Sequence, residues 1–482
     1  MPQQPRRLFE RGVFGELTNR IPGNDELASF AVDVTELCGR RDDAFEPRGH
    51  HGAIVALMYD FVNVDWSINM SADRAWLGAE DAARLLQVSR PTLYAYVSRG
   101  FVRSQATPGP SRDRLYSRDD VDRLRGRTEA RRDPDKAAAR SLQWGLPVLE
   151  SAITFIDGTN LYYRGHDALQ LSRSRSVAEV ASLIWSGQFE GAFSPTPPRI
   201  ATTFRPDTAL PFVPRAQAVL ASASVRDHAA FDLRAPSVTH AGWRILHLLT
   251  RVAGLSRTSG PTIDQALAHA WGVNARGVDV VRSALILCAD HELNVSSFTA
   301  RCVASAASNP YTVVIAGLAA LEGTRHGGTT ARVESMLESL AHARHPGTAV
   351  AARLRRGESI DGFGHPLYRD GDPRAIALLG LLRERYPRSR ELAFVLDVTA
   401  AATTITRERP NLDFALASVA RVLKLPAGSP LTLFAIGRTI GWIGQAIEQY
   451  ATGQLIRPRA KYVGIVPSVT TSTPDAQLPI PK

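Results

Sequence analysis

The sequence predicts an all-α protein in which a small unit of short helices precedes a much larger helical body. The chain has 482 residues, of which 44% are hydrophobic and 22% charged, so it is globular and too long for one compact core. From Val177 to Tyr450 the apolar residues recur almost throughout with the spacing of amphipathic helices. Brief extended pieces at 152–158 and 161–165 precede this helical stretch.

Cysteine and hydropathy patterns exclude several classes of protein. The cysteines Cys38, Cys288 and Cys302 lie too far apart for a disulfide framework or a cysteine-rich zinc site. No apolar run reaches the length that spans a bilayer, and the N-terminus lacks the pattern of a secretory signal. We therefore expect a cytoplasmic protein that has no membrane partner.

Charge is distributed unevenly along the chain. The net charge of +10 divides into −4 for residues 1–69, +5 for 70–145 and +9 for the remainder. Two basic regions can therefore meet different anions, such as nucleic acid and acidic metabolites. On charge alone, a solvated basic surface explains the excess equally well.

Residues 1–69 show no sustained periodicity and remain unassigned. Sequence order improves directly after Met70, so we expect either a disordered acidic arm or an over-long reading frame whose true start is Met70. N-terminal sequencing of protein from the native gene distinguishes the two.

Residues 70–127 predict a compact DNA-reading module. The expected elements are a helix at 80–86, a turn at Gln87-Val88, a second helix at 91–99 capped by Ser89, a hairpin strand at 112–116 and a helix at 118–124. This order resembles the winged helix-turn-helix of the MerR and excisionase type, whose second helix enters the major groove. The resemblance implies Arg90, Arg99 and Arg112 as DNA contacts. The alternative is a docking or dimer-stabilising appendage, with Tyr94 and Tyr96 as core residues. Residues 128–144 are predicted to be a linker.

Three histidines stand in loops between apolar helices and suggest chemistry. His291 lies in Asp-His-Glu, His326 in Arg-His-Gly-Gly, and His365 in Gly-Phe-Gly-His-Pro. A single histidine beside glycine is usually part of a capped turn, and no pair has the short spacing of zinc ligands. No Gly-x-Ser-x-Gly motif is present, so acyl transfer through a serine is disfavoured. Together with Asp413 and a series of later arginines, the histidines suit deprotonation of a carbon acid beside a polyanionic electrophile.

The order of these motifs from about Gly145 to Gly464 resembles the citrate synthase family. The resemblance rests on Ile156-Asp157-Gly158 and Tyr163-Arg164-Gly165, the three histidine loops, the Asp413 loop and the arginine segments around Arg438 and Arg457. It implies the citrate synthase fold: a large domain from 145–328 and 436–482, a small domain from 329–435, and a homodimer. Citrate synthase homologues with an N-terminal helix-turn-helix form a known bacterial subgroup.

The family's reaction condenses acetyl-CoA with oxaloacetate and water to citrate and CoA, a step of the tricarboxylic acid cycle. By resemblance, Asp413 is the base, His326 holds the enolate oxygen, and His365 assists at the ketone of oxaloacetate. The residues implied to bind substrate are His291, Arg374, Arg438 and Arg457 for oxaloacetate, and Arg369, Phe363 and Gly364 for CoA. Arg457 is implied to cross from the second subunit. Neither a metal nor a cofactor beyond the acyl-CoA substrate is implied.

Two further functions remain open from the sequence. One is 2-methylcitrate synthesis from propionyl-CoA, since one methylene changes binding in an apolar pocket by only about 1–3 kcal/mol. Arg325, which stands where the family commonly has leucine, leaves the acyl preference open. The other is a DNA-binding regulator that senses metabolites through the synthase fold.

Overall fold

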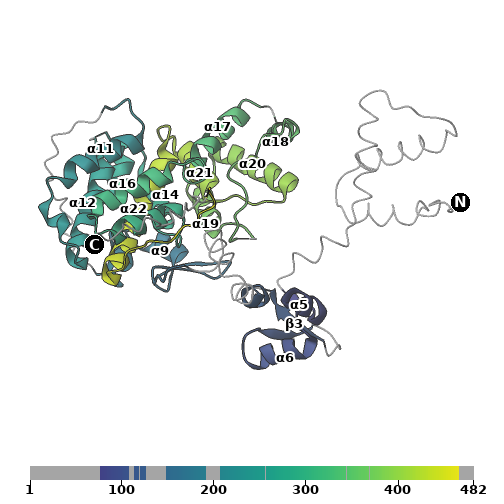
Figure 1. Ribbon diagram of the computed structural model, residues 1–482. Coiled ribbons are helices and arrows are strands. Elements are labelled where there is room, and N and C mark those ends of the chain that lie inside the picture. The colour runs from purple at the N-terminus through teal and green to yellow at the C-terminus, as the bar shows by residue number, and fades with distance from the viewer. Residues whose placement is uncertain are drawn as a thin grey trace, which may run out of the picture. The chain divides into compact units, whose positions relative to one another are not determined.

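The computed structural model describes residues 76–107, 113–118, 120–125, 148–190, 207–255, 257–343, 345–368 and 370–465. The chain divides into two compact units, Met1–Val148 and Leu149–Lys482 (Figure 1). The expectations for residues 1–69 and for the linker 128–144 lie outside the described residues. The division of the larger unit at 329 and 435 stays a prediction.

The described part of the first unit is a small helix-turn-helix with a three-stranded antiparallel sheet. Its elements are β1 (Trp76–Leu77), α5 (Ala79–Leu86), α6 (Arg90–Ser98), β2 (Ser104–Ala106) and β3 (Arg114–Ser117), with the strands in the order β1-β3-β2. The hydroxyl of Ser89 accepts the backbone N–H of Thr92, which caps α6 as the sequence predicts. Residues 120–125 form the expected last helix.

An apolar core holds this unit together. Leu77, Leu86, Leu93 and Val121 are all buried in it. Tyr96 packs against the same core, whereas Tyr94 on the outer face of α6 is 51% exposed. The two tyrosines of the second helix therefore differ in role, and only Tyr96 is a core residue.

The described part of the second unit is helical apart from one small antiparallel sheet. The sheet consists of β4 (Thr154–Ile156), β5 (Leu161–Tyr163) and β6 (His166–Asp167). The helices that follow are α9 (Ala168–Ser174), α10 (Val177–Ser186), α11 (Phe212–Ser224), η1 (His228–Phe231), α12 (Ala235–Ala253), α13 (Ile263–Ala270), α14 (Ala275–Leu287), α15 (Val295–Ser305), α16 (Pro310–Leu321), α17 (Thr329–Ala341), α18 (Pro346–Arg355), α19 (Pro373–Arg385), α20 (Arg390–Thr406), α21 (Leu412–Leu423) and α22 (Ser429–Thr452).

Helix α22 runs through the middle of this unit. It packs against α10, α12, α14, α15, α16 and α21, and nearly all of its side chains between Ser429 and Ala446 are buried (Figure 1). Glycines permit the close packing: a Cβ on Gly437 or Gly441 would lie 2.4 Å or 2.3 Å from a carbonyl oxygen of the segment that ends α14. α22 can therefore bring a polar residue, Arg438, into the centre of the fold. No helix among the described residues has the length and apolar character to cross a membrane.

Candidate active site

The three histidine loops predicted from the sequence all lie between helices. His291 lies between α14 and α15, His326 between α16 and α17, and His365 between α18 and α19. Asp413 is in the first turn of α21, and Arg374 is in the first turn of α19. Three inter-helix loops and the first turns of two helices thus supply five of these side chains, and the middle of α22 supplies Arg438.

Two of the histidines meet at one tyrosine. His291 Nε2 and the hydroxyl of Tyr368 are 2.9 Å apart. The ring of His365 lies 5.3 Å from that of His291 and 4.8 Å from that of Tyr368. Burial and the charges of Arg374 and Arg438 hold the pKa of His291 well below its usual range. His291 is therefore a neutral hydrogen-bonding group beside two cations.

His365 is held in a defined tautomer. Its Nδ1 accepts a hydrogen bond of 3.1 Å from the backbone N–H of Leu367. Burial, with a further contribution from Arg374, lowers the pKa of His365 to about 4, so the ring is neutral near pH 7. Because Nδ1 is the acceptor, the single proton of the neutral ring is on Nε2.

Arg374 forms a buried ion pair with the residue that caps its helix. Its Nε and Nη2 donate to the two carboxylate oxygens of Asp372 at 2.9 and 2.8 Å, and the two side chains are 4% and 0% exposed. Asp372 also accepts the backbone N–H groups of Arg374 and Leu412, so it joins the starts of α19 and α21. Burial opposes both charges, but the pairing outweighs it and lowers the pKa of Asp372 while raising that of Arg374.

Arg438 is buried with one donor nitrogen left without a partner. Its Nε donates to the carbonyl of Cys288 at 2.7 Å, and its guanidinium lies 4.9 Å from the centre of the Phe434 ring. Its Nη2 is buried without a hydrogen-bond partner. A buried cation with an unsatisfied donor is costly, so an anionic ligand is the natural partner for this nitrogen.

Asp413 is the carboxylate of the cluster. Burial raises its pKa to about 7, although the nearby charges of Arg374 and Arg438 act in the opposite direction. Its Oδ1 is buried without a hydrogen-bond partner. A carboxylate that titrates near neutral pH and keeps an unpaired oxygen is suited to accept a proton.

His326 contacts Ser296 at the start of α15. Its Nε2 is 2.8 Å from the Ser296 hydroxyl, which donates to Oδ1 of Asn294 at 2.8 Å. Burial, together with Arg438, lowers the pKa of His326 to about 3. The ring is therefore neutral, and the single proton of Ser296 decides which ring nitrogen carries the proton of His326.

The residues predicted to bind CoA are only partly described. Phe363 is buried against the Phe414 ring, with ring centres 4.8 Å apart, and Gly364 has a φ of +78°. This positive φ favours glycine, and a Cβ there would also displace the Glu408 carboxylate, which it would meet at 2.9 Å. Arg369 lies outside the described residues.

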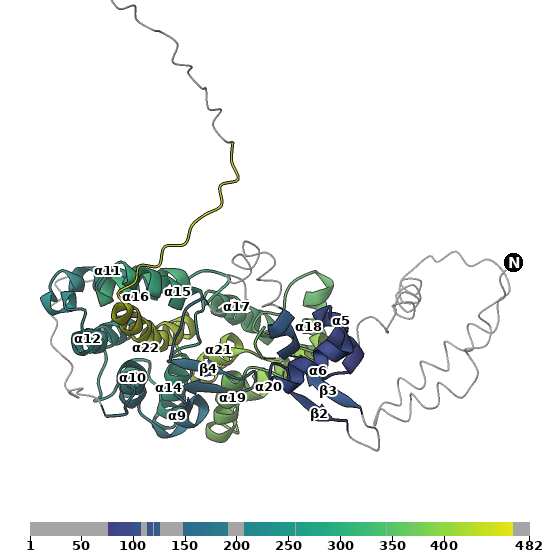
Figure 2. The ribbon, with the colours of Figure 1, turned by 60° about the horizontal axis from the view of Figure 1, so that its bottom comes forward.

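Arg457 does not join the other site residues within its own chain. It is exposed in the segment that follows α22, and this segment runs out from the helical body (Figure 2). The structure thus places His291, Arg374 and Arg438 within electrostatic reach of one another, and Arg457 separately.

Three residues that orient this site were not singled out from the sequence. They are Tyr368, Asp372 and Ser296. Only Asp372 had a recognisable local signal, because an aspartate before Pro373 is typical of a helix N-cap. Among the described residues, no group of histidine, cysteine or acidic side chains has an arrangement that holds a metal ion.

Comparison with known proteins shows which family the unit with the candidate active site is similar to. The family model for the citrate synthase C-terminal domain matches residues 214–459, and a helix-turn-helix domain model matches residues 76–127. Citrate synthase 2 of Bacillus subtilis is 37% identical over 190 residues, which is 39% of this chain and 51% of that protein. The citrate synthase of Haloferax volcanii is 30% identical over 360 residues, or 66% of this chain and 94% of that protein. The chain therefore spans about half of the first relative and nearly all of the second.

Solved structures show the same fold. Citrate synthase from Thermotoga maritima matches with a TM-score of 0.57 and 24% identity, over 67% of this chain and 95% of that one. The enzyme from Thermoplasma acidophilum, solved with carboxymethyl coenzyme A and oxaloacetate, gives a TM-score of 0.59 and 21% identity over 68% and 97%. The chain belongs to the citrate synthase family and carries an additional helix-turn-helix domain before the family fold.

Proposed function

We propose that the chain is a citrate synthase-type acyltransferase that condenses acetyl-CoA with oxaloacetate and water, giving citrate and CoA. The observation that supports this most directly is the unpaired, buried oxygen of Asp413, in a carboxyl whose pKa is raised to about 7. Two buried arginines and neutral histidines accompany it. This combination suits the removal of a proton from carbon beside a bound dianion.

Oxaloacetate binds through the cationic part of the cluster. The free Nη2 of Arg438 is a donor for one of its carboxylates, and Arg374 supplies a second guanidinium. His291, held by Tyr368, adds a neutral donor or acceptor. Arg457 of a second subunit of a homodimer completes this set.

Enolisation is carried out by Asp413 and His326. Asp413 removes a proton from the methyl carbon of the acetyl thioester, and the thioester oxygen takes up the developing charge. In the structure the Ser296 hydroxyl donates to Oδ1 of Asn294. Rotation of this hydroxyl toward Nε2 of His326 leaves the histidine its own proton on Nδ1, from which it donates to the enolate oxygen. Such a preorganised donor typically contributes about 2.7–4 kcal/mol to transition-state stabilisation.

His365 assists carbon–carbon bond formation. The Nδ1 of His365 accepts the Leu367 N–H, so the single ring proton is on Nε2. From there it polarises the ketone of oxaloacetate. The enolate carbon attacks the ketone carbon, and the resulting alkoxide takes the proton from His365. The proton that Asp413 removed from carbon is then released and restores the neutral His365, so that the protons balance. Water then hydrolyses the citryl thioester to citrate and CoA.

A thiol-release assay tests this proposal. Purified full-length protein is mixed with oxaloacetate and either acetyl-CoA or propionyl-CoA, and free CoA thiol is followed with time. We expect release that requires oxaloacetate and that falls by at least about 10³-fold in Asp413→Asn. Asp397→Asn, on α20, is the matched control and should retain activity.

The outcome with the two thioesters decides the acyl group. A higher kcat/KM for propionyl-CoA in a competition for one oxaloacetate pool would replace our assignment with 2-methylcitrate synthesis. No oxaloacetate-dependent thiol release with either substrate would contradict the enzyme proposal as a whole.

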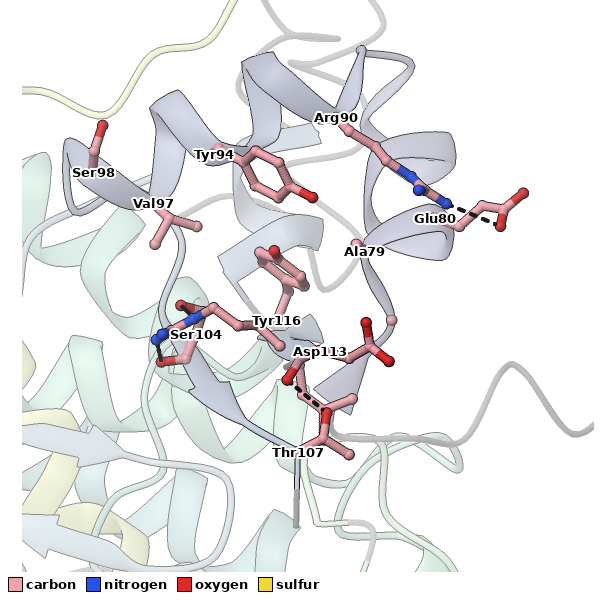
Figure 3. A pocket seen from close by; sticks show the side chains of 13 residues that line it. Ala79, Glu80, Arg90, Tyr94, Val97, Ser98, Ser104, Thr107, Asp113 and Tyr116 are labelled. Carbon is pink, nitrogen blue, oxygen red and sulfur yellow. Dashed lines mark hydrogen bonds and ion pairs between the residues drawn. The ribbon is translucent and has the colours of Figure 1, made fainter. Parts of the chain in front are cut away.

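A second function, DNA binding, is supported by the groove between α6 and the sheet of the first unit. The pocket there is about 980 Å³ and its lining includes Arg90, Tyr94, Arg114 and Tyr116 (Figure 3). Arg90 is paired with Glu80 at 3.3 Å, and Arg99 is exposed at the end of α6. Arg112 lies outside the described residues. Basic and aromatic side chains on the exposed face of a second helix favour contact with a duplex.

Selection of genomic fragments at physiological salt tests this second function. We expect a palindromic site, bound at least about tenfold more weakly by Arg99→Ala, with Arg388→Ala as a control on an arginine of the other unit. Salt-sensitive binding without sequence preference would argue against a regulator.

A further inference from the structure

Arg332 is a charged residue close to the candidate active site that the mechanism has not used. It lies on α17, four residues after Gly328, and is 51% exposed. Its Nη2 is 3.0 Å from Oδ1 of Asp361, whose side chain is only 10% exposed. Asp361 also accepts a hydrogen bond from Ser359. The arginine thus connects α17 to a mostly buried carboxylate on the loop that leads to Phe363 and His365.

The backbone beside Asp361 makes close contact with two helices. A Cβ on Gly362 would lie 2.8 Å from the Cβ of Phe414 and 3.0 Å from Cγ2 of Val333. The Gly362 carbonyl accepts the N–H of Asn411, the residue that caps α21. Gly362 is therefore packed between α17 and the first turn of α21.

This contact brings the backbone positions of three charged residues into one region. Arg332 precedes Val333, Asp361 precedes Gly362, and Asp413 precedes Phe414. Gly362 and the two residues that it contacts, Val333 and Phe414, are thus the direct sequence neighbours of Asp361, Arg332 and Asp413. The Gly362 contact and the Arg332–Asp361 ion pair both involve protein atoms alone, so neither depends on a bound ligand.

We infer that Arg332 is a positioning residue of this site: through Asp361 it fixes the loop that carries Phe363 and His365, and its positive charge acts on the Asp413 carboxylate. The inference rests on the proposed function in so far as Asp413 is the base. It adds a residue from α17 and assigns opposite electrostatic effects to the two members of one ion pair.

The other charged groups around Asp413 are fixed by their own contacts. Arg374 and Asp372 face it from the start of α19, and Arg438 faces it from α22. The Cys288 thiol at the end of α14 also lies within its reach, with a pKa raised by burial. His326 and His365 are neutral at pH 7. Arg332 lowers the pKa of Asp413 and is, of these cations, the one half-exposed to solvent.

Two single substitutions distinguish the effect of the Arg332–Asp361 contact on the loop from the effect of the Arg332 charge on Asp413. Arg332→Gln and Asp361→Asn both break the ion pair, so both should weaken the loop and reduce kcat/KM to a similar extent. Arg332→Gln removes a positive charge near Asp413 and should move the acidic limb of kcat/KM upward by a few tenths to about one pH unit. Asp361→Asn removes a negative charge and should move the limb downward or leave it in place.

A third variant and an activity-independent measurement complete the test. Arg332→Lys keeps the charge and should return the limb to the wild-type pH. Potentiometric difference titration of each variant against the same variant carrying Asp413→Asn follows the proton of Asp413 without turnover. This titration should show the same opposite shifts.

The possible results are distinct. An upward shift in Arg332→Gln, together with a downward shift or no shift in Asp361→Asn, supports the inference. Shifts of the same sign, or an unmoved limb in Arg332→Gln, overturn it. An inactive wild-type protein would contradict the proposed function, while the difference titration would still decide whether the charge of Arg332 acts on Asp413.

Discussion

At the scale of single residues, the site separates charged from neutral groups by burial. Desolvation favours the uncharged form of every ionisable group, so it keeps His326 and His365 neutral and makes Asp413 a stronger base than an exposed aspartate. Arg374 stays charged because Asp372 pairs with it inside the same low-dielectric region. One physical cause therefore produces both the neutral donors and the base.

The pH dependence of activity follows from these pKa directions. Only deprotonated Asp413 accepts a proton, and burial raises its pKa to about 7, so kcat/KM for acetyl-CoA should rise with pH through about 7 and then level off. His326 and His365 have pKa values of about 3 and 4 and should add no further limb above about pH 5.

Initial rates at saturating oxaloacetate between about pH 5 and pH 9 measure this profile. A single limb with unit slope is the expected result. A profile that is flat down to about pH 5 would show that Asp413 has an ordinary carboxylate pKa and that burial does not tune it.

The sequence predicted the candidate reacting side chains but not the residues that contact them. His291, His326, His365 and Asp413 were predicted from motif order. Their partners were not, because the contacts join segments that are distant in sequence: Tyr368 is 77 residues from His291, and Ser296 is 30 residues from His326. No local sequence pattern around a tyrosine or a serine predicts such a contact.

At the scale of elements, helix N-termini carry much of the site. Asn294 caps α15, Asp372 caps α19 and Asn411 caps α21, and each cap lies within a few residues of a site side chain. Caps fix the first turn of a helix because they satisfy its free N–H groups. Asp372 extends this role, since it caps one helix and also accepts the N–H of Leu412 in another.

Caps also explain which elements could be predicted. The helical pattern predicted from the sequence begins at Val177, where α10 begins, and Ser176 and Glu179 form a reciprocal capping box at its start. By contrast, β1 is two residues long and exists only through pairing with β3, some 40 residues later. Such pairing depends on tertiary contacts that no local pattern contains.

Asp372→Asn should be strongly destabilising. It leaves Arg374 buried without its counter-charge, and breaking a buried pair in this way typically costs about 3–5 kcal/mol. Because Arg374 then also lacks its fixed geometry, the KM for oxaloacetate should rise. Chemical denaturation and steady-state kinetics measure the two effects.

The chain offers a matched control for this substitution. Asp232 and Arg234 form a two-point ion pair with the same spacing, but the Arg234 side chain is 85% exposed. Asp232→Asn should therefore have a far smaller effect on stability and none on the KM for oxaloacetate. Equal losses in the two variants would show that burial of the Asp372 pair has no special importance.

At the scale of the whole molecule, the position of Arg457 raises the question of a second subunit. It follows α22 in an exposed segment that also carries Leu455, Tyr462 and Val463, which are 62%, 70% and 89% exposed. Large apolar side chains so exposed favour burial against another surface. A homodimer in which each segment reaches the partner's site would both cover them and deliver Arg457.

Mixing two inactive variants tests whether Arg457 acts across subunits. Asp413→Asn lacks the base, and Arg457→Ala lacks the arginine, so each homodimer alone should be inactive. In a mixed dimer, the site that keeps Asp413 receives Arg457 from the other subunit and should work. Random assortment makes half of the dimers mixed with one working site each, so thiol release should recover to about a quarter of the wild-type rate. If Arg457 serves its own chain, every site lacks one residue, and the mixture should remain as inactive as its components.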